Sequence, residues 1–291
     1  MSTISAPDQD LSLVLAQYGD RLRRKRKSPH TLTGFATAAT RYDRWLRAQG
    51  KSAEDATFAD VEDYFDQLPL APSSKATHLK MIRAAYAYGV QRGTLRQNPA
   101  IDVEIEAAEW REPRVIATPV LRDIRGGIQL TRDWIFFHLL AYTGMRRHEI
   151  ATLRWDDGDE GGSVVKLADQ SIRVLGKGNK PRTVPIHPVL QECLLFHQGE
   201  PGRWVVPSDG KKGVAVDTIQ AMVKRLHPVY TPHDYRRTVA TSLRRNGVDE
   251  SVRNRIMGWG PKDIFMRHYD HVADAELHRG ILRLYADDPL D

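Results

Sequence analysis

Apolar and polar residues in the first hundred positions alternate with the period of an α-helix. The clearest apolar stripe recurs every three or four residues and comprises Leu32, Phe35, Ala39, Tyr42 and Leu46. Just before it, Ser28 offers an N-cap and Pro29 suits the first helical position. Further helices are expected over 58–68 and from residue 73 or 74 to the glycine at 93. The pattern predicts an all-helical domain over residues 1–100.

The stretch from 98 to 117 holds two prolines and no sustained period, which predicts a linker at 101–117. Three short β-type runs then occur at 163–167, 171–175 and 182–186. Helical patterns flank them at 129–142, 147–154, 187–198, 216–227, 232–246, 249–257 and 273–285. This order predicts a second domain, 118–291, that is mainly helical α+β with a small antiparallel sheet.

The composition is typical of a cytoplasmic globular protein. Hydrophobic residues make up 41% of the chain, enough for ordinary cores, yet no apolar run is long enough to span a bilayer. The polar N-terminus does not resemble a secretory signal. The single cysteine, Cys193, cannot form an internal disulfide and is expected to be a small buried hydrophobe. No membrane partner is expected.

Positive charge is concentrated locally within a net charge of +6. Residues 21–47 hold nine Lys or Arg and one acid, whereas residues 54–66 hold six acids and no base. One basic face suits DNA phosphates, although a solvated helix end gives the same pattern. The side chains that we assign to DNA contact are Arg24, Lys25, Arg26, Lys27, Arg41, Arg44, Lys80 and Arg83.

Two segments offer a cation to a phosphate. Gly144 ends one helix and Arg146 begins the next, where backbone N–H groups point outward and Glu149 can hold the guanidinium. Taken alone, a surface arginine pair with a local salt bridge is the simpler explanation. The sequence from Gly176 to Asn179 predicts a hairpin turn with Lys177 at its tip. Such a lysine can act as a general acid or merely keep the sheet edge soluble.

Two later segments add a histidine, an arginine and a tyrosine. His233 and Arg236 are spaced to share one face of a helix, so both can converge on a single anion, although this spacing also occurs by chance. Further on, Trp259 precedes Tyr269, which has a histidine on either side. That tyrosine is either an activated phenol or a ring packed in a core.

In their joint order these segments resemble the catalytic domain of the tyrosine recombinases, the family of phage integrases, Xer recombinases and Cre. The matching motifs are T-G-M-R-R-H-E, G-K-G-N-K-P-R-T-V-P, H-D-Y-R-R-T-V-A-T and Y-D-H-V. The resemblance covers about residues 9–285. It implies the two-domain tyrosine recombinase fold, in which the first domain is an all-α, SAM-like core-binding domain and the second is catalytic.

The resemblance also implies a role for each matching residue. The catalytic positions are Arg146, Lys177, His233, Arg236, Trp259 and Tyr269, with Glu149 as a supporting carboxylate. The two arginines clamp the phosphate, the lysine is the general acid, the histidine lies beside the phosphate, and the tyrosine is the nucleophile. Choosing Arg146 over Arg147, and Arg236 over Arg237, rests on motif spacing.

The chain departs from the usual family pattern in three places. Trp259 stands where most members have histidine, and its indole N–H can donate a hydrogen bond but cannot shuttle a proton. Ten residues separate Trp259 from Tyr269, where nine is the commoner spacing. Tyr235 and Arg237 replace the usual leucine and histidine. None of these changes removes a required group.

The implied reaction cleaves and rejoins DNA through a 3′-phosphotyrosine intermediate, without metal, ATP or any other cofactor. The implied partners are double-stranded DNA and three further copies of the chain in a tetramer on two DNA sites, with accessory DNA-bending proteins as possible additions. The C-terminal apolar stripe at Leu277, Ile281 and Leu284 suits either the chain's own core or a neighbouring subunit, and the resemblance favours the neighbour.

Phage or mobile-element integration is the expected role. The start of the chain leaves no room for an additional arm-type DNA-binding domain, which favours a simple system. Two alternatives stay open. One is a DNA-binding protein that keeps the fold without the activity, and the other is an enzyme resembling type IB topoisomerases. The presence of Arg146, Lys177, His233, Arg236 and Tyr269 counts against the first, and the core-binding domain counts against the second.

Overall fold

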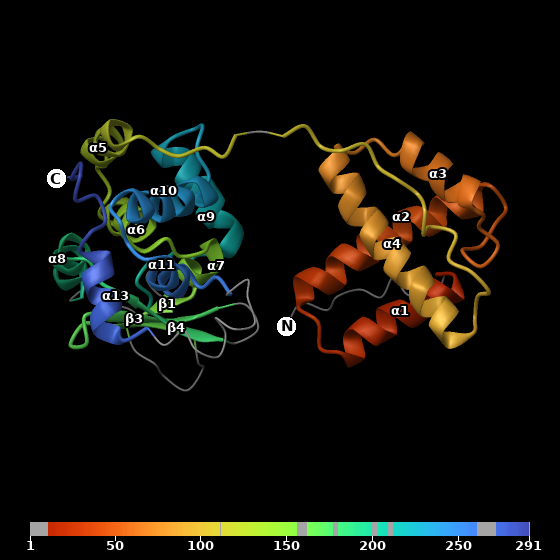
Figure 1. Cartoon of the computed structure of the whole chain (residues 1–291), viewed down its shortest axis with the longest axis horizontal. Coiled ribbons are helices and arrows are strands. Elements are labelled where there is room, and N and C mark those ends of the chain that lie inside the picture. Colours follow the sequence, from red (N-terminus) through yellow and green to blue (C-terminus); the bar gives the residue numbers. More distant parts are fainter. Residues whose placement is uncertain are drawn as a thin grey trace. The chain divides into compact units, whose positions relative to one another are not determined.

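The computed structural model describes residues 11–110, 112–155, 162–176, 180–198, 203–208, 212–260 and 272–290. The chain divides into two compact units, Met1–Arg111 and Glu112–Asp291, and each has its own hydrophobic core. In Figure 1 the first unit runs from red to yellow and the second from yellow-green to blue. Within the described residues the first unit is all-helical, and the second combines helices with one small sheet.

The first unit is built from α1 (Leu13–Arg24), α2 (Pro29–Ala48), α3 (Phe58–Gln67) and α4 (Pro72–Arg92). The Ser28 hydroxyl caps α2 by accepting from the Thr31 amide, and Gly93 ends α4 in the left-handed region. The apolar stripe of α2 faces the core, where the hydroxyls of Tyr42 and Tyr86 lie 2.7 Å apart in a hydrogen bond. Val90, near the end of α4, is exposed.

The first unit extends past residue 100. Ala100 and Val103 are buried in its core. Arg83 donates from Nε to the Ala100 carbonyl at 2.8 Å and from Nη2 to the Val103 carbonyl. The Asn98 amide group in turn donates to the Arg83 carbonyl at 3.1 Å. The beginning of the predicted linker therefore packs on α4, and the guanidinium of Arg83 is engaged with the chain itself.

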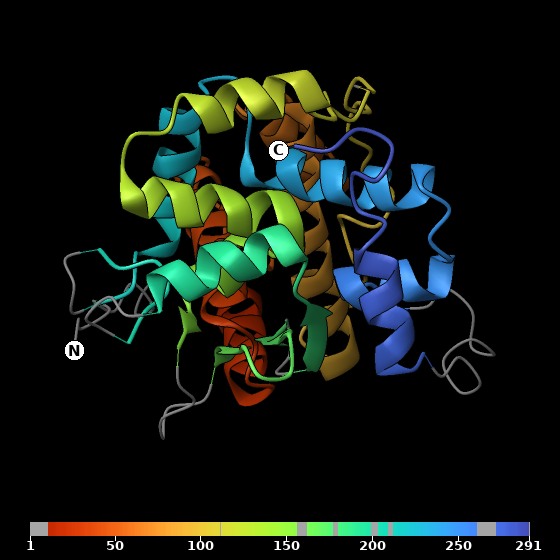
Figure 2. The same ribbon diagram turned by 90° about the vertical axis from the view of Figure 1, so that its left-hand side faces the viewer.

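The second unit is organised around a helix that is buried along most of its length. Its helices are α5 (Thr118–Gly126), α6 (Thr131–Thr143), α7 (Arg147–Ala151), α8 (Pro188–His197), α9 (Val216–Leu226), α10 (Pro232–Arg245), α11 (Glu250–Met257) and α13 (Asp274–Ile281). The central helix is α6, which is buried from Ile135 to Thr143 and packs against α8, α9 and α10. Figure 2 shows α6 and α8 side by side, in yellow-green and teal. Cys193 of α8 is buried, as predicted.

The sheet has four strands in the order β1 (Leu153–Arg154), β2 (Ser163–Lys166), β3 (Ser171–Leu175) and β4 (Pro181–Pro185). The pairs β2–β3 and β3–β4 are antiparallel, as predicted. However, β1 pairs with β2 in parallel, so the sheet is mixed rather than purely antiparallel. Residues 153–154 were expected to continue a helix, but a two-residue strand is too short to carry a period that would identify it.

The C-terminal apolar stripe packs into the chain's own core. Leu277, Ile281 and Leu284 are all buried there, and α13 lies against α11 and β4. Beyond it, Arg122 of α5 donates to the Pro289 carbonyl at 2.8 Å and so ties down the end of the chain. The expectation that this stripe docks on a neighbouring subunit is therefore wrong. Among the described helices, none combines the length and the apolar character that crossing a bilayer requires.

Candidate active site

The junction between α6 and α7 positions Arg146. Gly144 adopts a φ of +60°, a conformation that favours glycine, and a Cβ there would lie 2.9 Å from Cε of Met257. Arg146 is then the N-cap of α7. The carboxylate of Glu149 accepts from the Arg146 amide at 2.7 Å and from its Nη1 at 2.9 Å. The predicted support of Arg146 by Glu149 is thus present in both the main chain and the side chain.

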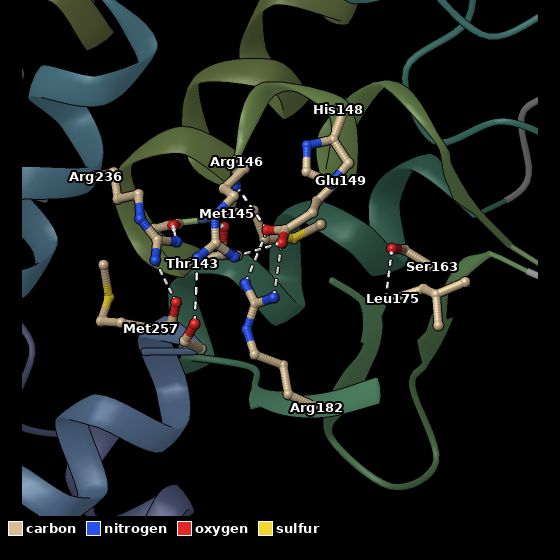
Figure 3. Close-up of polar contacts among 12 residues, drawn as sticks. Thr143, Met145, Arg146, His148, Glu149, Ser163, Leu175, Arg182, Arg236 and Met257 are labelled. Carbon is tan, nitrogen blue, oxygen red and sulfur yellow. Dashed lines mark hydrogen bonds and ion pairs between the residues drawn. The ribbon is translucent and has the colours of Figure 1, made fainter. Parts of the chain in front are cut away.

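The C-terminal end of α11 gathers three arginines. Successive carbonyls of Ile256, Met257 and Gly258 accept hydrogen bonds from Arg182, Arg236 and Arg146 respectively, and we call these three carbonyls the α11 platform. The bonds to Ile256 and Gly258 measure 3.1 and 3.2 Å. The last carbonyls of a helix lack intrahelical donors and carry the negative end of its dipole, which favours cations here. Figure 3 shows the side chains of the three arginines converging.

Glu149 forms a second, fully buried ion pair with Arg182 of β4. Two parallel bonds of 2.8 Å join Nη1 and Nη2 of Arg182 to the two carboxylate oxygens. Burial alone raises the pKa of Glu149, but the bonds from Arg182 and Arg146 outweigh it and bring the pKa down to about 2. The carboxylate is therefore ionised throughout the neutral range, and it neutralises part of the positive charge around it.

Arg236 is fixed by the start of α10. The Thr231 hydroxyl and the Asp234 side chain form a capping box there, which orients the first turns of the helix. The buried guanidinium of Arg236 donates to the carbonyls of Gly144 and Met257, and it lies 5.7 Å from the centre of the Trp259 ring. Burial and the nearby Arg146 lower the pKa of Arg236 to about 9, so it stays charged at neutral pH. Trp259 thus contacts a predicted phosphate-clamping arginine.

Arg146 and Arg236 share a cavity of about 290 Å³ with His233, which is exposed at its edge. The cavity lining also includes Met145, Arg147, Gln220, Thr231 and Pro232. Partial burial, together with Arg237 and Arg236, lowers the pKa of His233 below its usual value. A neutral imidazole beside two guanidinium groups can accept a proton while the arginines bind an anion.

The neighbouring arginines are more exposed and each lies near a carboxylate, although Arg147 also lines the cavity. Nη1 of Arg147 lies 3.8 Å from an oxygen of Asp217, and Nη1 of Arg237 lies 3.6 Å from an oxygen of Asp234. Both side chains are more than 40% exposed. The geometry therefore favours the same member of each pair that motif spacing favours.

Two predicted catalytic residues, Lys177 and Tyr269, lie outside the described residues, and the structure gives no position for either. The residue before Lys177 is described. The Gly176 amide donates to the Lys180 carbonyl at 2.9 Å, and a Cβ on Gly176 would lie 3.9 Å from Oε1 of Glu149. The base of the predicted lysine hairpin therefore lies beside Glu149.

Sequence reasoning gave Arg182 no role, although its side chain is only 7% exposed and belongs to the site. The available signal was strand periodicity, because Arg182 and the buried Val184 stand two residues apart and so share a face of β4. In the first unit, most of the side chains that were predicted to contact DNA are exposed. They are Arg24, Lys25, Arg26, Lys27, Arg41, Arg44 and Lys80. The described residues contain no cluster of three His, Cys, Asp or Glu side chains suited to a metal ion.

Two guanidinium groups fixed in this way, on a mainly helical α+β unit, are suited to binding an anion. The model of the Phage integrase family matches residues 123–276, more than half of the chain, and the chain belongs to this family. The predicted family, the tyrosine recombinases, is confirmed.

Tyrosine recombinase XerC of Mycobacterium tuberculosis is 26% identical over 279 residues, which cover 86% of this chain and 91% of the relative. The solved structure of the Tn1549 transposon integrase in complex with circular intermediate DNA matches with a TM-score of 0.69 and 16% identity, covering 93% of this chain and 99% of that one. A lambda integrase tetramer bound to a Holliday junction matches with a TM-score of 0.68 and 15% identity, covering 94% and 86%.

Proposed function

We propose that this protein is a site-specific recombinase that cleaves and rejoins duplex DNA through a covalent bond between Tyr269 and a 3′-phosphate. The observation that carries the proposal is the fixed pair of guanidinium groups, Arg146 and Arg236, on adjacent carbonyls of the α11 platform, facing one cavity with His233. Such preorganised donors bind the non-bridging oxygens of a phosphodiester and stabilise the charge that develops on attack.

In the proposed cleavage step, Oη of Tyr269 attacks phosphorus and the bond from phosphorus to the 5′ oxygen breaks. The phenolic proton passes to His233, and the leaving oxygen takes a proton from Lys177. Rejoining reverses these transfers when a 5′-hydroxyl of another strand attacks the phosphotyrosine. Because the phosphoester bond is kept in the covalent intermediate, the cycle uses no nucleotide, and two arginines supply the charge stabilisation that a metal gives elsewhere.

The proposed partner is duplex DNA, contacted in the first unit by the exposed basic side chains and in the second by the guanidinium clamp. We propose a tetramer on two DNA sites as the working assembly, since exchange of two duplexes requires four strand cuts. The DNA-bound integrase structures of the same fold support this assembly by analogy.

For the biological role, we propose integration of a phage or another mobile element. Similarity to XerC over nearly the full length of both chains favours a second candidate, an Xer-type chromosomal role. Sequencing of the DNA that the protein captures separates them. Junctions at the ends of a mobile element support integration, and a single fixed chromosomal locus supports the Xer-type role.

The activity itself is tested by adduct capture. Purified protein is mixed with sheared DNA of its source organism and denatured, and protein-linked fragments are recovered and sequenced. We expect fragments joined through a 3′-phosphate to Tyr269 and enriched for one sequence. The Tyr269→Phe variant gives none, whereas Tyr285→Phe, which alters a buried tyrosine whose hydroxyl donates to the Ala141 carbonyl, still gives them.

The outcomes also separate the alternatives. Specific DNA binding without any adduct indicates a binding protein that keeps the fold without the activity. Adducts without sequence enrichment, together with relaxation of supercoiled DNA that lacks a target site, indicate an activity like that of type IB topoisomerases. An adduct that persists in Tyr269→Phe shows that the nucleophile is another residue.

A further inference from the structure

The cavity that holds the two clamp arginines, Arg146 and Arg236, is also lined by two polar side chains that have no role in the proposed reaction. They are Arg147 of α7 and Gln220 of α9, and these two helices pack against each other. Arg236 is buried, whereas the side chain of Arg146 is 32% exposed and that of Arg147 is 49% exposed. Arg147 therefore lies nearer to solvent than the clamp arginines, at the outer part of the same cavity.

The ion pair that Arg147 makes with its own chain is weak. An oxygen of Asp217 lies 3.8 Å from Nη1 of Arg147, and the Asp217 side chain is 98% exposed. Water and salt screen a pair this exposed, so the guanidinium keeps most of its capacity to bind an anion. The other lining side chain, Gln220, is neutral and half-buried. The wall that it forms with Arg147 is therefore positively charged.

The cavity is larger than one phosphate group requires. Its volume is about 290 Å³, whereas a cavity of about 150 Å³ already accommodates benzene. A phosphate held by Arg146 and Arg236 thus leaves room for part of the adjoining nucleotide. Because a DNA strand is continuous, a sugar adjoins the bound phosphate, and the next phosphate follows about 3.4 Å further along the helix axis.

Arginine can also recognise a base, through two hydrogen bonds to guanine in the major groove. The position of Arg147 favours a phosphate instead. Base edges lie in the grooves, while the clamp arginines draw the backbone itself into the cavity that Arg147 lines. The chain segment nearest to a bound phosphate is the backbone on either side of it, so the closest anion for Arg147 is the neighbouring phosphate.

We propose that Arg147 binds the phosphate next to the one held by Arg146 and Arg236, on the same DNA strand. This inference rests on the proposed function. A single clamped phosphate fixes one point of the backbone but leaves the strand free to turn about it. A contact with the adjacent phosphate fixes the direction in which the strand crosses the cavity.

The test measures coupling between a side chain and a single phosphate. A methylphosphonate replaces one phosphate of the target duplex and removes its charge, and a series of duplexes has this change at successive positions. The dissociation constant of each duplex is measured by fluorescence anisotropy in a Tyr269→Phe background, which keeps binding reversible. If a side chain contacts a given phosphate, its replacement no longer weakens binding once that phosphate is neutral.

Two further variants locate the clamp phosphate without any need for cleavage. Arg236→Lys and Arg146→Gln should both couple to one position in the series, and the second variant serves if the first does not fold, because Arg146 is partly exposed. We expect Arg147→Gln to keep its melting temperature and to weaken binding of the unmodified duplex about tenfold, as for loss of a hydrogen bond to a charged group. The loss should fall below about twofold when one phosphate adjacent to the clamp position is neutral.

Arg237→Gln is the matched control. Arg237 is exposed to a similar extent, 41%, and also lies near a carboxylate, Asp234, but it does not line the cavity. Its effect on affinity should be the same for the unmodified duplex and for the duplexes neutralised at or beside the clamp position. An equally selective effect in Arg237→Gln would overturn the inference, since coupling would then not depend on the cavity.

Three results with Arg147→Gln also overturn the inference. The first is an unchanged loss of affinity when either adjacent phosphate is neutral. The second is coupling to the clamp phosphate itself, which makes Arg147 a member of the clamp. The third is a loss that disappears when a flanking base pair is replaced, which indicates recognition of a base.

A failure of the proposed function is recognised separately. If the wild-type protein forms no adduct with DNA, that proposal fails. The coupling measurements then use a duplex selected by binding alone, and they still decide whether Arg147 contacts the phosphate beside the clamp.

Discussion

Gly258 lies against the side chain of Arg182 so closely that a Cβ would stand 2.7 Å from Cδ and 2.9 Å from Nε. The glycine also has a φ of +63°, a conformation in which other residues are strained. The backbone at this point bears the carbonyl that accepts from Arg146, so neither partner can move without disturbing the clamp.

Gly258→Ala should therefore lower the free energy of unfolding by roughly 2–4 kcal/mol, as strain and overpacking add together. Urea unfolding at neutral pH measures this loss. Gly93→Ala is the matched control, because Gly93 ends α4 with a φ of +76° and a Cβ there would have nothing within 4 Å. Gly93→Ala should lower the free energy of unfolding by only about 1–2 kcal/mol, because alanine is strained in the left-handed conformation. Equal costs at the two positions would contradict the close contact with Arg182.

The Glu149 carboxylate should make part of the protein's stability depend on pH. Its pKa is about 2 in the folded protein, against 4.5 for a free side chain. Since the folded value is the lower one, this stabilisation is complete above pH 4.5 and is lost as the pH falls toward 2. The loss amounts to about 3 kcal/mol for a shift of this size.

Glu149→Gln checks this dependence. The variant should be less stable than the wild-type protein by about 3–5 kcal/mol at pH 7, because it leaves Arg182 buried without its counter-charge. Urea unfolding at a series of pH values should show that the difference narrows steadily below pH 4.5. A difference that stays constant down to pH 3 would mean that the contacts with Arg182 and Arg146 do not lower the pKa of Glu149 as the geometry requires.

Sequence patterns located most helices of both units, since amphipathic stripes and caps such as Ser28 and Gly93 are local signals. They missed α1 and α5 as separate helices, although both show apolar residues on one face. The predicted fate of Leu277 and Ile281 was wrong for a different reason. A stripe shows that a face is covered, but it does not identify which surface covers it.

For the site, motif order selected Arg146 and Arg236 as a pair, and the structure brings both side chains to one cavity. Motif order could not predict the backbone carbonyls to which the arginines are bound. The α11 platform consists of backbone carbonyls, which every residue possesses, so no residue type at 256–258 marks it. Arg182 was overlooked because a single charged residue in a short strand is ordinarily assigned to solvent.

Arg236 and Arg237 offer a direct comparison of a buried and a surface arginine in the same helix. Arg236→Lys removes the two-pronged contact with the carbonyls of Gly144 and Met257, and we expect it to slow adduct formation by roughly 100- to 1000-fold. Arg237→Lys should slow it less than about threefold, because this side chain is 41% exposed and lies near Asp234. Single-turnover assays on the captured duplex measure both. Comparable defects in the two variants would show that the wrong arginine has been assigned to the clamp.

The first unit provides a pair of basic residues on α4 that should behave in opposite ways. Lys80 is exposed, whereas the Arg83 guanidinium donates to the carbonyls of Ala100 and Val103. Neutralising one phosphate contact reduces the dependence of log affinity on log salt concentration by about one unit. Lys80→Gln should therefore flatten this salt dependence by about that amount and leave the melting temperature nearly unchanged.

Arg83→Gln should instead lower the melting temperature and leave the salt dependence close to that of the wild-type protein, because its donors satisfy backbone carbonyls within the unit. DNA binding measured by fluorescence anisotropy between 50 and 200 mM salt (about the range in which phosphate contacts dominate) decides the matter. A flattened salt dependence in Arg83→Gln would mean that this guanidinium leaves its carbonyl partners for DNA. If Lys80→Gln leaves the salt dependence of DNA affinity unchanged, the exposed face of α4 does not contact DNA phosphates.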